Sequence, residues 1–136
     1  MKLPYEGGCL CGEVRYRISA EPHDAGYCHC RMCQRATGAP VVAWLTVASA
    51  ALAWTEHDPA VYRSSEKAER LFCPRCGTQL GFRETALPDQ LDVTLASLDD
   101  PEAVRPSHHI WTASRIGWFD VADALPRYPE RGPESN

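Results

Sequence analysis

ERLFCPRCGTQLGFRE, residues 69–84, is the stretch of sequence that decides the fold. Its two arms carry β-forming residues on either side of the turn residues CPRCGT, a pattern that predicts a β-hairpin. Cys73 and Cys76 stand at the tip, and Gly77 allows the positive φ that such a turn needs. Two thiolates at this spacing can hold one metal ion while N–H groups of the turn donate to the sulfurs. We interpret the tip as a zinc knuckle, which supplies two of the four ligands of a closed structural site.

The other two ligands are expected in GGCLCGE, residues 7–13. Alternation in an extended segment sends Cys9 and Cys11 to the same side, which suits two ligands of one ion. The flanking glycines let the backbone wrap closely around it. We therefore predict a structural zinc that ties the N-terminal strand to the distant hairpin, with the ligands Cys9, Cys11, Cys73 and Cys76.

The remaining cysteines form a second group. The chain has seven cysteines, and an odd number excludes a complete set of intramolecular disulfides. Four of them fill the structural site, so three are left in CHCRMC, residues 28–33. Three ligands with an open fourth position are the pattern of a reactive zinc site. We predict that Cys28, Cys30 and Cys33 hold this second zinc.

A histidine that closes the second site is the alternative. His29 stands between two of the ligands and would point away from the ion that they share. The other histidines leave the alternative open, and they are His23, His57, His108 and His109.

The donor set of the second site favours a sulfur guest. Three thiolates on Zn²⁺ leave a formal charge of −1, so the ion acidifies water less than a site of three neutral imidazoles does. A sulfur-rich site also prefers a soft fourth ligand. We therefore expect the guest to be a thiol bound as thiolate, rather than hydroxide.

Length and composition limit the class of protein. The 136 residues suit one domain, which we place at residues 1–128, followed by a loose tail at residues 129–136. No stretch approaches the ~20 apolar residues of a membrane span or resembles a signal peptide, so we expect a cytoplasmic protein. The formal net charge is −4 and the basic residues are scattered, which disfavours a nucleic-acid partner.

The pattern of the remaining chain predicts a mainly β fold. Prolines and glycines cut it into short segments, and several alternate with period two. Beside the hairpin, strands are expected at residues 14–19, 40–47, 91–97 and 108–114. Helix is expected only in one or two turns after Cys30 and at residues 99–104, where an aspartate could cap and Pro101 suits the first turn.

Four motifs in this order resemble the glutathione-dependent formaldehyde-activating enzyme family, which also includes centromere protein V. They are GGCLCGEVRY, CHCRMCQRATGAP, CPRCGTQL and HHIWTASRIGWF, and the similarity runs from about Gly7 to Tyr128. The resemblance implies a β-tent fold of antiparallel sheets, a structural zinc on the first and third motifs, and a second, weaker zinc on the three cysteines of CHCRMC. The activity that it implies joins formaldehyde to the thiol of glutathione to give S-hydroxymethylglutathione, formally a carbon–sulfur lyase in reverse.

Two functions follow as hypotheses. The first is an enzyme that binds a glutathione-like thiol at the second zinc and presents it to a small aldehyde. His109 is its candidate proton shuttle or pocket residue, and Arg31, Arg35 and Arg115 are the candidates for binding the carboxylates of glutathione. The second is a non-catalytic thiol- or zinc-binding module, such as a glutathione carrier or redox sensor. A chromatin-binding zinc protein is a third class, which the acidic balance disfavours.

Overall fold

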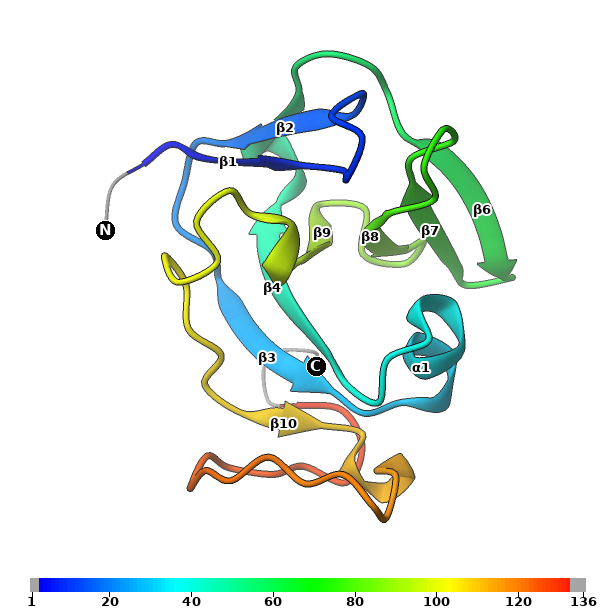
Figure 1. Cartoon of the computed structure of the whole chain (residues 1–136), viewed down its shortest axis with the longest axis vertical. Helices are drawn as coiled ribbons and strands as arrows, with labels where there is room; N and C mark the ends of the chain where they lie inside the picture. The colour runs from blue at the N-terminus through cyan, green and yellow to red at the C-terminus, as the bar shows by residue number, and fades with distance from the viewer. Residues whose placement is uncertain (1–2, 133–136) are drawn as a thin grey trace.

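Two sheets meet across one apolar core in the structure, a computed structural model that describes residues 3–132 (Figure 1). The smaller sheet has the strand order β1-β2-β5, and the larger has the order β10-β3-β4-β9-β8-β7-β6. The smaller sheet lies at the top of the view in Figure 1, and β10 lies near the bottom. The prediction of a mainly β fold with little helix is confirmed.

Short strands carry almost all of the regular structure. They are β1 (Tyr5–Gly8), β2 (Arg15–Ile18), β3 (Asp24–Cys28), β4 (Val42–Ala48), β5 (Leu52–Trp54), β6 (Ala60–Ser65), β7 (Ala68–Phe72), β8 (Gln79–Glu84), β9 (Gln90–Thr94) and β10 (His109–Ile110). Every pairing is antiparallel except that of β10 with β3. The predicted hairpin is confirmed, because β7 pairs with β8 and places Arg70 opposite Phe82.

Two predicted strands are shorter than expected. β9 ends at Thr94, and the chain continues as a 3-10 turn, η2 (Leu95–Ser97). β10 covers only two residues, after which the chain turns through Trp111 at φ 56° into the 3-10 turn η3 (Thr112–Ser114). The β-forming residues at 108–114 predicted a longer strand. The positive φ of Trp111 ends β10, because left-handed backbone does not continue a strand.

Helix is confirmed at one of the two predicted places. α1 (Arg31–Thr37) follows Cys30, whose sulfur accepts from the backbone N–H of Cys33 as an N-cap, and it ends at Gly38 with φ 74°. The helix predicted at residues 99–104 is wrong. The N–H of Ala103 donates to the backbone oxygen of Asp100 at 3.1 Å and closes a single turn. Pro106 follows, and because the residue before a proline disfavours helical backbone, too few residues are left for a second turn.

The apolar residues gather in two clusters. The main core fills the space between the sheets and includes Ile18, Leu45 and Val47. A smaller cluster joins Val42 and Trp44 to two of the cysteines. Because successive residues of a strand face opposite sides, β4 contributes to both clusters.

The end of the described chain runs back along β10. The backbone oxygen of Glu130 accepts from the N–H of Trp111 at 2.9 Å, and Arg131 pairs with Glu84 at 2.8 Å. Residues 133–136 lie outside the described residues, so the division at residues 128 and 129 stays a prediction. Within residues 3–132, no helix has the length and apolar character needed to cross a membrane.

Candidate metal centres

Two turns bring four cysteines together, as the spacing predicts. The sulfur atoms of Cys9, Cys11, Cys73 and Cys76 all lie within 4.8 Å of one another. The sulfur of Cys11 is 3.6 Å from that of Cys9 and 3.8 Å from that of Cys73. A tetrahedral zinc with Zn–S bonds of about 2.3 Å requires S···S edges of about 3.8 Å. These free thiols therefore fit a tetrahedral metal site and are far outside disulfide distance.

The local structure around the first pair differs from the prediction. Cys9 and Cys11 share a site because the chain turns between β1 and β2, not because it is extended. The N–H of Gly12 donates to the backbone oxygen of Cys9 at 3.2 Å, and Gly12 has φ 82°. A positive φ is easily adopted by glycine, which makes this tight turn possible.

Backbone donors surround the sulfurs of the knuckle, as predicted. The N–H groups of Arg75 and Cys76 point to the sulfur of Cys73 at 3.3 and 3.4 Å. Gly77 has the expected positive φ, 80°. The Thr78 hydroxyl lies 3.2 Å from the sulfur of Cys76. This contact, together with the backbone N–H groups of Thr78 and Cys11, lowers the pKa of Cys76 to about 5. Such contacts stabilise thiolates, which are the form that binds a metal.

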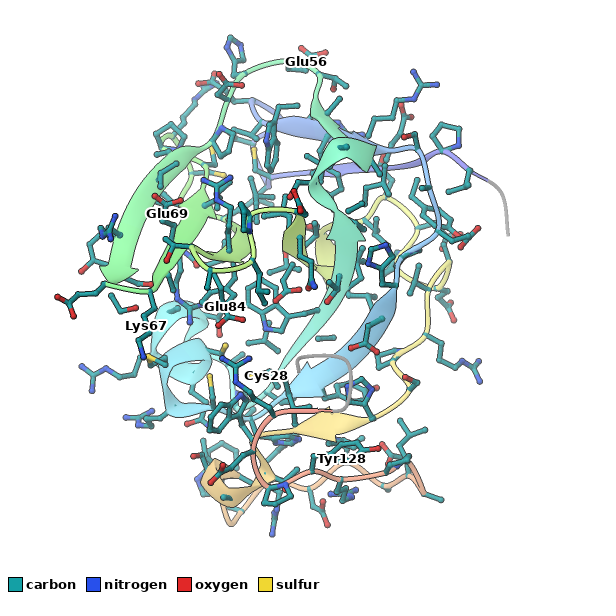
Figure 2. The ribbon with its side chains drawn as sticks, turned by 180° about the vertical axis from the view of Figure 1, so that it is seen from behind. Cys28, Glu56, Lys67, Glu69, Glu84 and Tyr128 are labelled. Carbon is teal, nitrogen blue, oxygen red and sulfur yellow. The ribbon has the colours of Figure 1, made fainter. Side chains whose placement is uncertain are left out.

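The three other cysteines form a second group at the end of the larger sheet. Cys28 is the last residue of β3, Cys30 caps α1, and Cys33 lies one turn into that helix. Their sulfurs also lie within 4.8 Å of one another. Figure 2 shows Cys28 where β3 approaches α1. Cys28 and Cys33 are buried, and Cys30 is half-buried, so the group has one side toward the surface.

The crowded sulfurs cannot all carry a negative charge without a cation. Contacts with Cys28 and then Cys33 lower the pKa of Cys30. Contacts with Cys30 and Cys33 and burial raise the pKa of Cys28 far above its usual range. Without a cation, ionisation of one of these thiols therefore disfavours ionisation of the others. A divalent cation removes this limit, because metal binding deprotonates its cysteine ligands.

An arginine that the sequence reasoning missed contacts this group. Arg70 on β7 is 6% exposed, and its Nη2 lies 3.7 Å from the sulfur of Cys33. Its guanidinium lies 4.9 Å from the centre of the Phe82 ring. The only sequence signal is a charged residue within a strand, which is equally typical of a solvent-facing position.

A pocket of about 480 Å³ adjoins the arginine. Elements α1, β6, β7 and β8 line it with Met32, Arg35, Ala36, Tyr62, Ser64, Arg70, Phe72 and Gln79. Of the three arginines proposed for carboxylates, only Arg35 lines this pocket. Arg31 lies 3.4 Å from the side-chain oxygen of Gln34, and Arg115 donates to the backbone oxygen of Phe119 at 2.7 Å.

The histidines form a separate buried chain. Nε2 of His29 lies 2.8 Å from Nδ1 of His109, whose Nε2 lies 2.9 Å from Asp123. Both rings are fully buried, and that of His109 stacks on Tyr27 at 4.7 Å. Among residues 3–132, no histidine belongs to either group of close ligand atoms. The structure therefore brings His109 to the residue between Cys28 and Cys30, but gives the three sulfurs no histidine as a fourth ligand.

Fold and site together define a mainly β protein with two separate cysteine clusters that could hold metal ions. Residues 4–114 match the family described as glutathione-dependent formaldehyde-activating enzyme, and the chain belongs to this family.

Three known proteins are similar to the chain. An "uncharacterized lyase" of Schizosaccharomyces pombe is 35% identical over 81 residues, which are 60% of this chain and 58% of that protein. The match thus spans less than two thirds of the yeast protein. A "putative glutathione-dependent formaldehyde-activating enzyme" of Halomonas elongata is 27% identical over 127 residues, 85% of this chain and 80% of that protein. A crystal structure of a Rhodobacter sphaeroides protein superposes with a TM-score of 0.58 at 25% identity, covering 74% of this chain and 91% of that one.

Proposed function

We propose that the protein is a zinc-dependent enzyme of the carbon–sulfur lyase type. It binds a glutathione-like thiol at Cys28, Cys30 and Cys33 and adds it to a small aldehyde such as formaldehyde. The observation that carries the proposal is a group of three close sulfurs to which the described residues add no fourth ligand. The names of the family and of the two relatives support this class of reaction.

The donor chemistry of both clusters fits zinc. Four thiolates make a closed structural site, and three leave a position for a substrate. We therefore propose two zinc ions per chain, a structural one on Cys9, Cys11, Cys73 and Cys76 and a reactive one on Cys28, Cys30 and Cys33. When bound at the second cluster, the ion lowers the pKa of a substrate thiol and keeps it as thiolate.

The pocket beside the cluster suits the rest of the thiol molecule. Its volume of about 480 Å³ falls within the ~300–1,000 Å³ of small-molecule sites. Arg35 and Arg70 place two positive charges in its lining, which favours a ligand with carboxylates. In the reaction, the thiol loses its proton, its sulfur bonds to the aldehyde carbon, and the carbonyl oxygen takes up a proton.

His109 remains a proposed positioning group for this reaction. Its hydrogen bonds connect His29, which stands between two cysteines of the cluster, to Asp123 on the chain segment that follows η3. These hydrogen bonds can fix the backbone from Cys28 to Cys30, and thereby the positions of two sulfurs. Its full burial supports this structural role in shaping the site more than a role in proton transfer.

A non-catalytic thiol- or zinc-binding module is the second candidate. The hydrogen-bond donors to these sulfurs within residues 3–132 are the N–H of Cys33 and the guanidinium of Arg70. Neither group exchanges protons as a general acid at neutral pH, which favours binding without turnover. The two candidates differ in turnover. If the protein forms the adduct of thiol and aldehyde faster than the uncatalysed reaction does, it is an enzyme and not a binding module.

The variant Cys30→Ser tests the thiol site. We expect the variant to stay folded, to carry one zinc instead of two, and to bind no glutathione, because the open cluster loses a ligand. Calorimetric titration of glutathione into wild type and variant measures binding, with metal content and circular dichroism on the same samples. Equal glutathione binding by both proteins would show that this cluster is not the thiol site.

A further inference from the structure

Arg70 is a buried cation that has no carboxylate partner within the part of the chain that the structure describes. Arg70 is 6% exposed, and none of the ion pairs among residues 3–132 includes it. A buried charge is costly unless an opposite charge or strong hydrogen bonds compensate it. The Phe82 ring, 4.9 Å away, offers partial compensation through its π-face.

The atom that compensates Arg70 more directly is a sulfur. Its Nη2 donates to Cys33, and the three sulfurs are the anionic groups next to it when they are ionised. The sulfurs of Cys28 and Cys30 lie within 4.8 Å of that of Cys33, so the positive charge of Arg70 also stabilises their thiolates. The arginine therefore acts on the whole cluster and not on Cys33 alone.

The Nη1 atom of the Arg70 guanidinium has no hydrogen-bond partner among residues 3–132. Nη1 of Arg70 and Oε1 of Gln79 are buried polar atoms without a hydrogen bond, and both residues line the pocket beside the cluster. Native proteins leave few such atoms unsatisfied, so each one calls for an explanation, such as a functional role or a bound water or ion. The guanidinium of Arg70 is thus only partly hydrogen-bonded, at the boundary between the sulfurs and the pocket.

Charge counting connects these observations. Three thiolates and one divalent ion sum to −1, and an anionic fourth ligand brings the sum to −2. We infer that Arg70 is the counter-cation of the three-cysteine centre: it offsets the surplus negative charge, helps to retain the metal there, and makes an anionic fourth ligand favourable. This role rests on the proposed function, because it assumes that Cys28, Cys30 and Cys33 hold a divalent ion. Arg70 is a positioning residue, since it would act through the sulfurs.

Two variants of Arg70 separate its charge from its shape. Arg70→Gln removes the charge and keeps an N–H donor, whereas Arg70→Lys keeps the charge and removes the planar fork. The control is Arg63→Gln, the same change of charge at an exposed position on the adjacent strand β6. The measurement is the zinc affinity of the weaker site in the full chain, by competition with a chromophoric chelator, with circular dichroism and total metal content on each sample.

We expect Arg70→Gln to weaken zinc binding at the second site by about 10- to 100-fold, the usual effect of removing a group that supports metal ligands. Arg70→Lys should lose less, and Arg63→Gln should match wild type. The first, four-cysteine zinc should stay bound in all variants. Equal second-site affinity in Arg70→Gln and wild type would overturn the inference.

Two further outcomes are decisive. If Arg70→Gln does not fold, Arg70→Lys decides: a folded lysine variant that keeps its second zinc supports the counter-cation, and one that loses the zinc overturns it. If wild type itself binds only one zinc, the proposed function fails at the metal. That result is distinct from failure of the inference alone, in which wild type binds two ions and Arg70→Gln binds them equally well.

Discussion

The two cysteine clusters differ in how much of the chain they connect. The four-cysteine cluster joins a turn of the smaller sheet to the hairpin tip of the larger one, and the contact between Cys11 and Cys73 spans 62 residues. The three-cysteine cluster lies within residues 28–33, at the junction of β3 and α1. One cluster therefore connects distant parts of the fold, and the other connects neighbours that are already held by the chain.

We propose that this difference separates a structural site from a reactive one. Closing a long loop costs more entropy than closing a short one, so an ion that holds distant segments contributes more to the fold. Cys9 and Cys73 belong to the main core, whereas Cys28 and Cys33 belong to the smaller cluster. Arg70, which contacts Cys33, lines the pocket. Under this proposal, fold stability depends on one metal site and ligand binding on the other, and each of the predictions below tests this assignment.

The largest expected effect is that of Cys73→Ser. A structural zinc in a small site supplies roughly 10–16 kcal/mol of apparent binding free energy, which equals or exceeds the ~5–15 kcal/mol net stability of a domain. We expect the variant to be unfolded, as measured by circular dichroism and thermal unfolding. Cys30→Ser is the matched comparison, because it removes one ligand from the other cluster. Similar thermal midpoints for the two variants would refute the difference between the clusters.

Partial removal of metal should give an intermediate effect. A mild chelator should take one zinc first, from the three-cysteine cluster, because its fourth position is open to exchange. The remaining one-zinc protein should lose less than about 2 kcal/mol of unfolding free energy, since that ion closes only a short loop. Metal content along a series of chelator concentrations measures the order of zinc loss, and thermal unfolding of the same samples measures the loss of stability. Simultaneous loss of both ions with the fold would contradict the assignment.

The sequence predicts the two groups of cysteines because the short spacing within each motif restricts the geometry of its sulfur atoms. Turn residues next to C-x-C and C-x-x-C restrict where the sulfurs can point, and the β7–β8 hairpin is set by local alternation. The structure brings the sulfurs of Cys9 and Cys11 together as expected, although the turn that achieves this was not predicted. Local chemistry thus determined the grouping even where the predicted backbone was wrong.

The remaining features of the fold and of the site depend on contacts between distant segments, which a single sequence does not reveal. β3, β5 and β6 were not predicted as strands. In β3, small residues and a glycine have weak β preference until neighbouring strands pair with them. The turn at residues 99–104 was predicted as helix because capping signals outweighed the short length. Arg70 and the pair of His29 with His109 became recognisable only when the fold placed them beside the cysteines.

The smallest expected effect concerns Thr78, which connects the two halves of the four-cysteine cluster. Its hydroxyl oxygen accepts from the N–H of Leu10 at 3.0 Å and lies 3.2 Å from the sulfur of Cys76. Thr78→Val keeps the shape and removes both contacts, so the Leu10 N–H loses its side-chain partner and the Cys76 thiolate loses a donor. We expect a loss of about 1 kcal/mol of unfolding free energy, the usual net contribution of such a hydrogen bond.

Thr85→Val is the matched control for this variant. The Thr85 hydroxyl donates to a backbone oxygen, that of Lys67, at 3.3 Å, at the exposed end of the same hairpin and away from the sulfurs. Denaturant unfolding of the zinc-loaded proteins measures both changes, and chelator competition measures the metal. If the four-cysteine zinc supports the fold, Thr78→Val should weaken zinc retention and stability together, while Thr85→Val should leave zinc retention unchanged. A loss of stability in Thr78→Val at unchanged zinc affinity would mean that the hydroxyl supports the turn alone, and that the sulfurs hold their ion without its help.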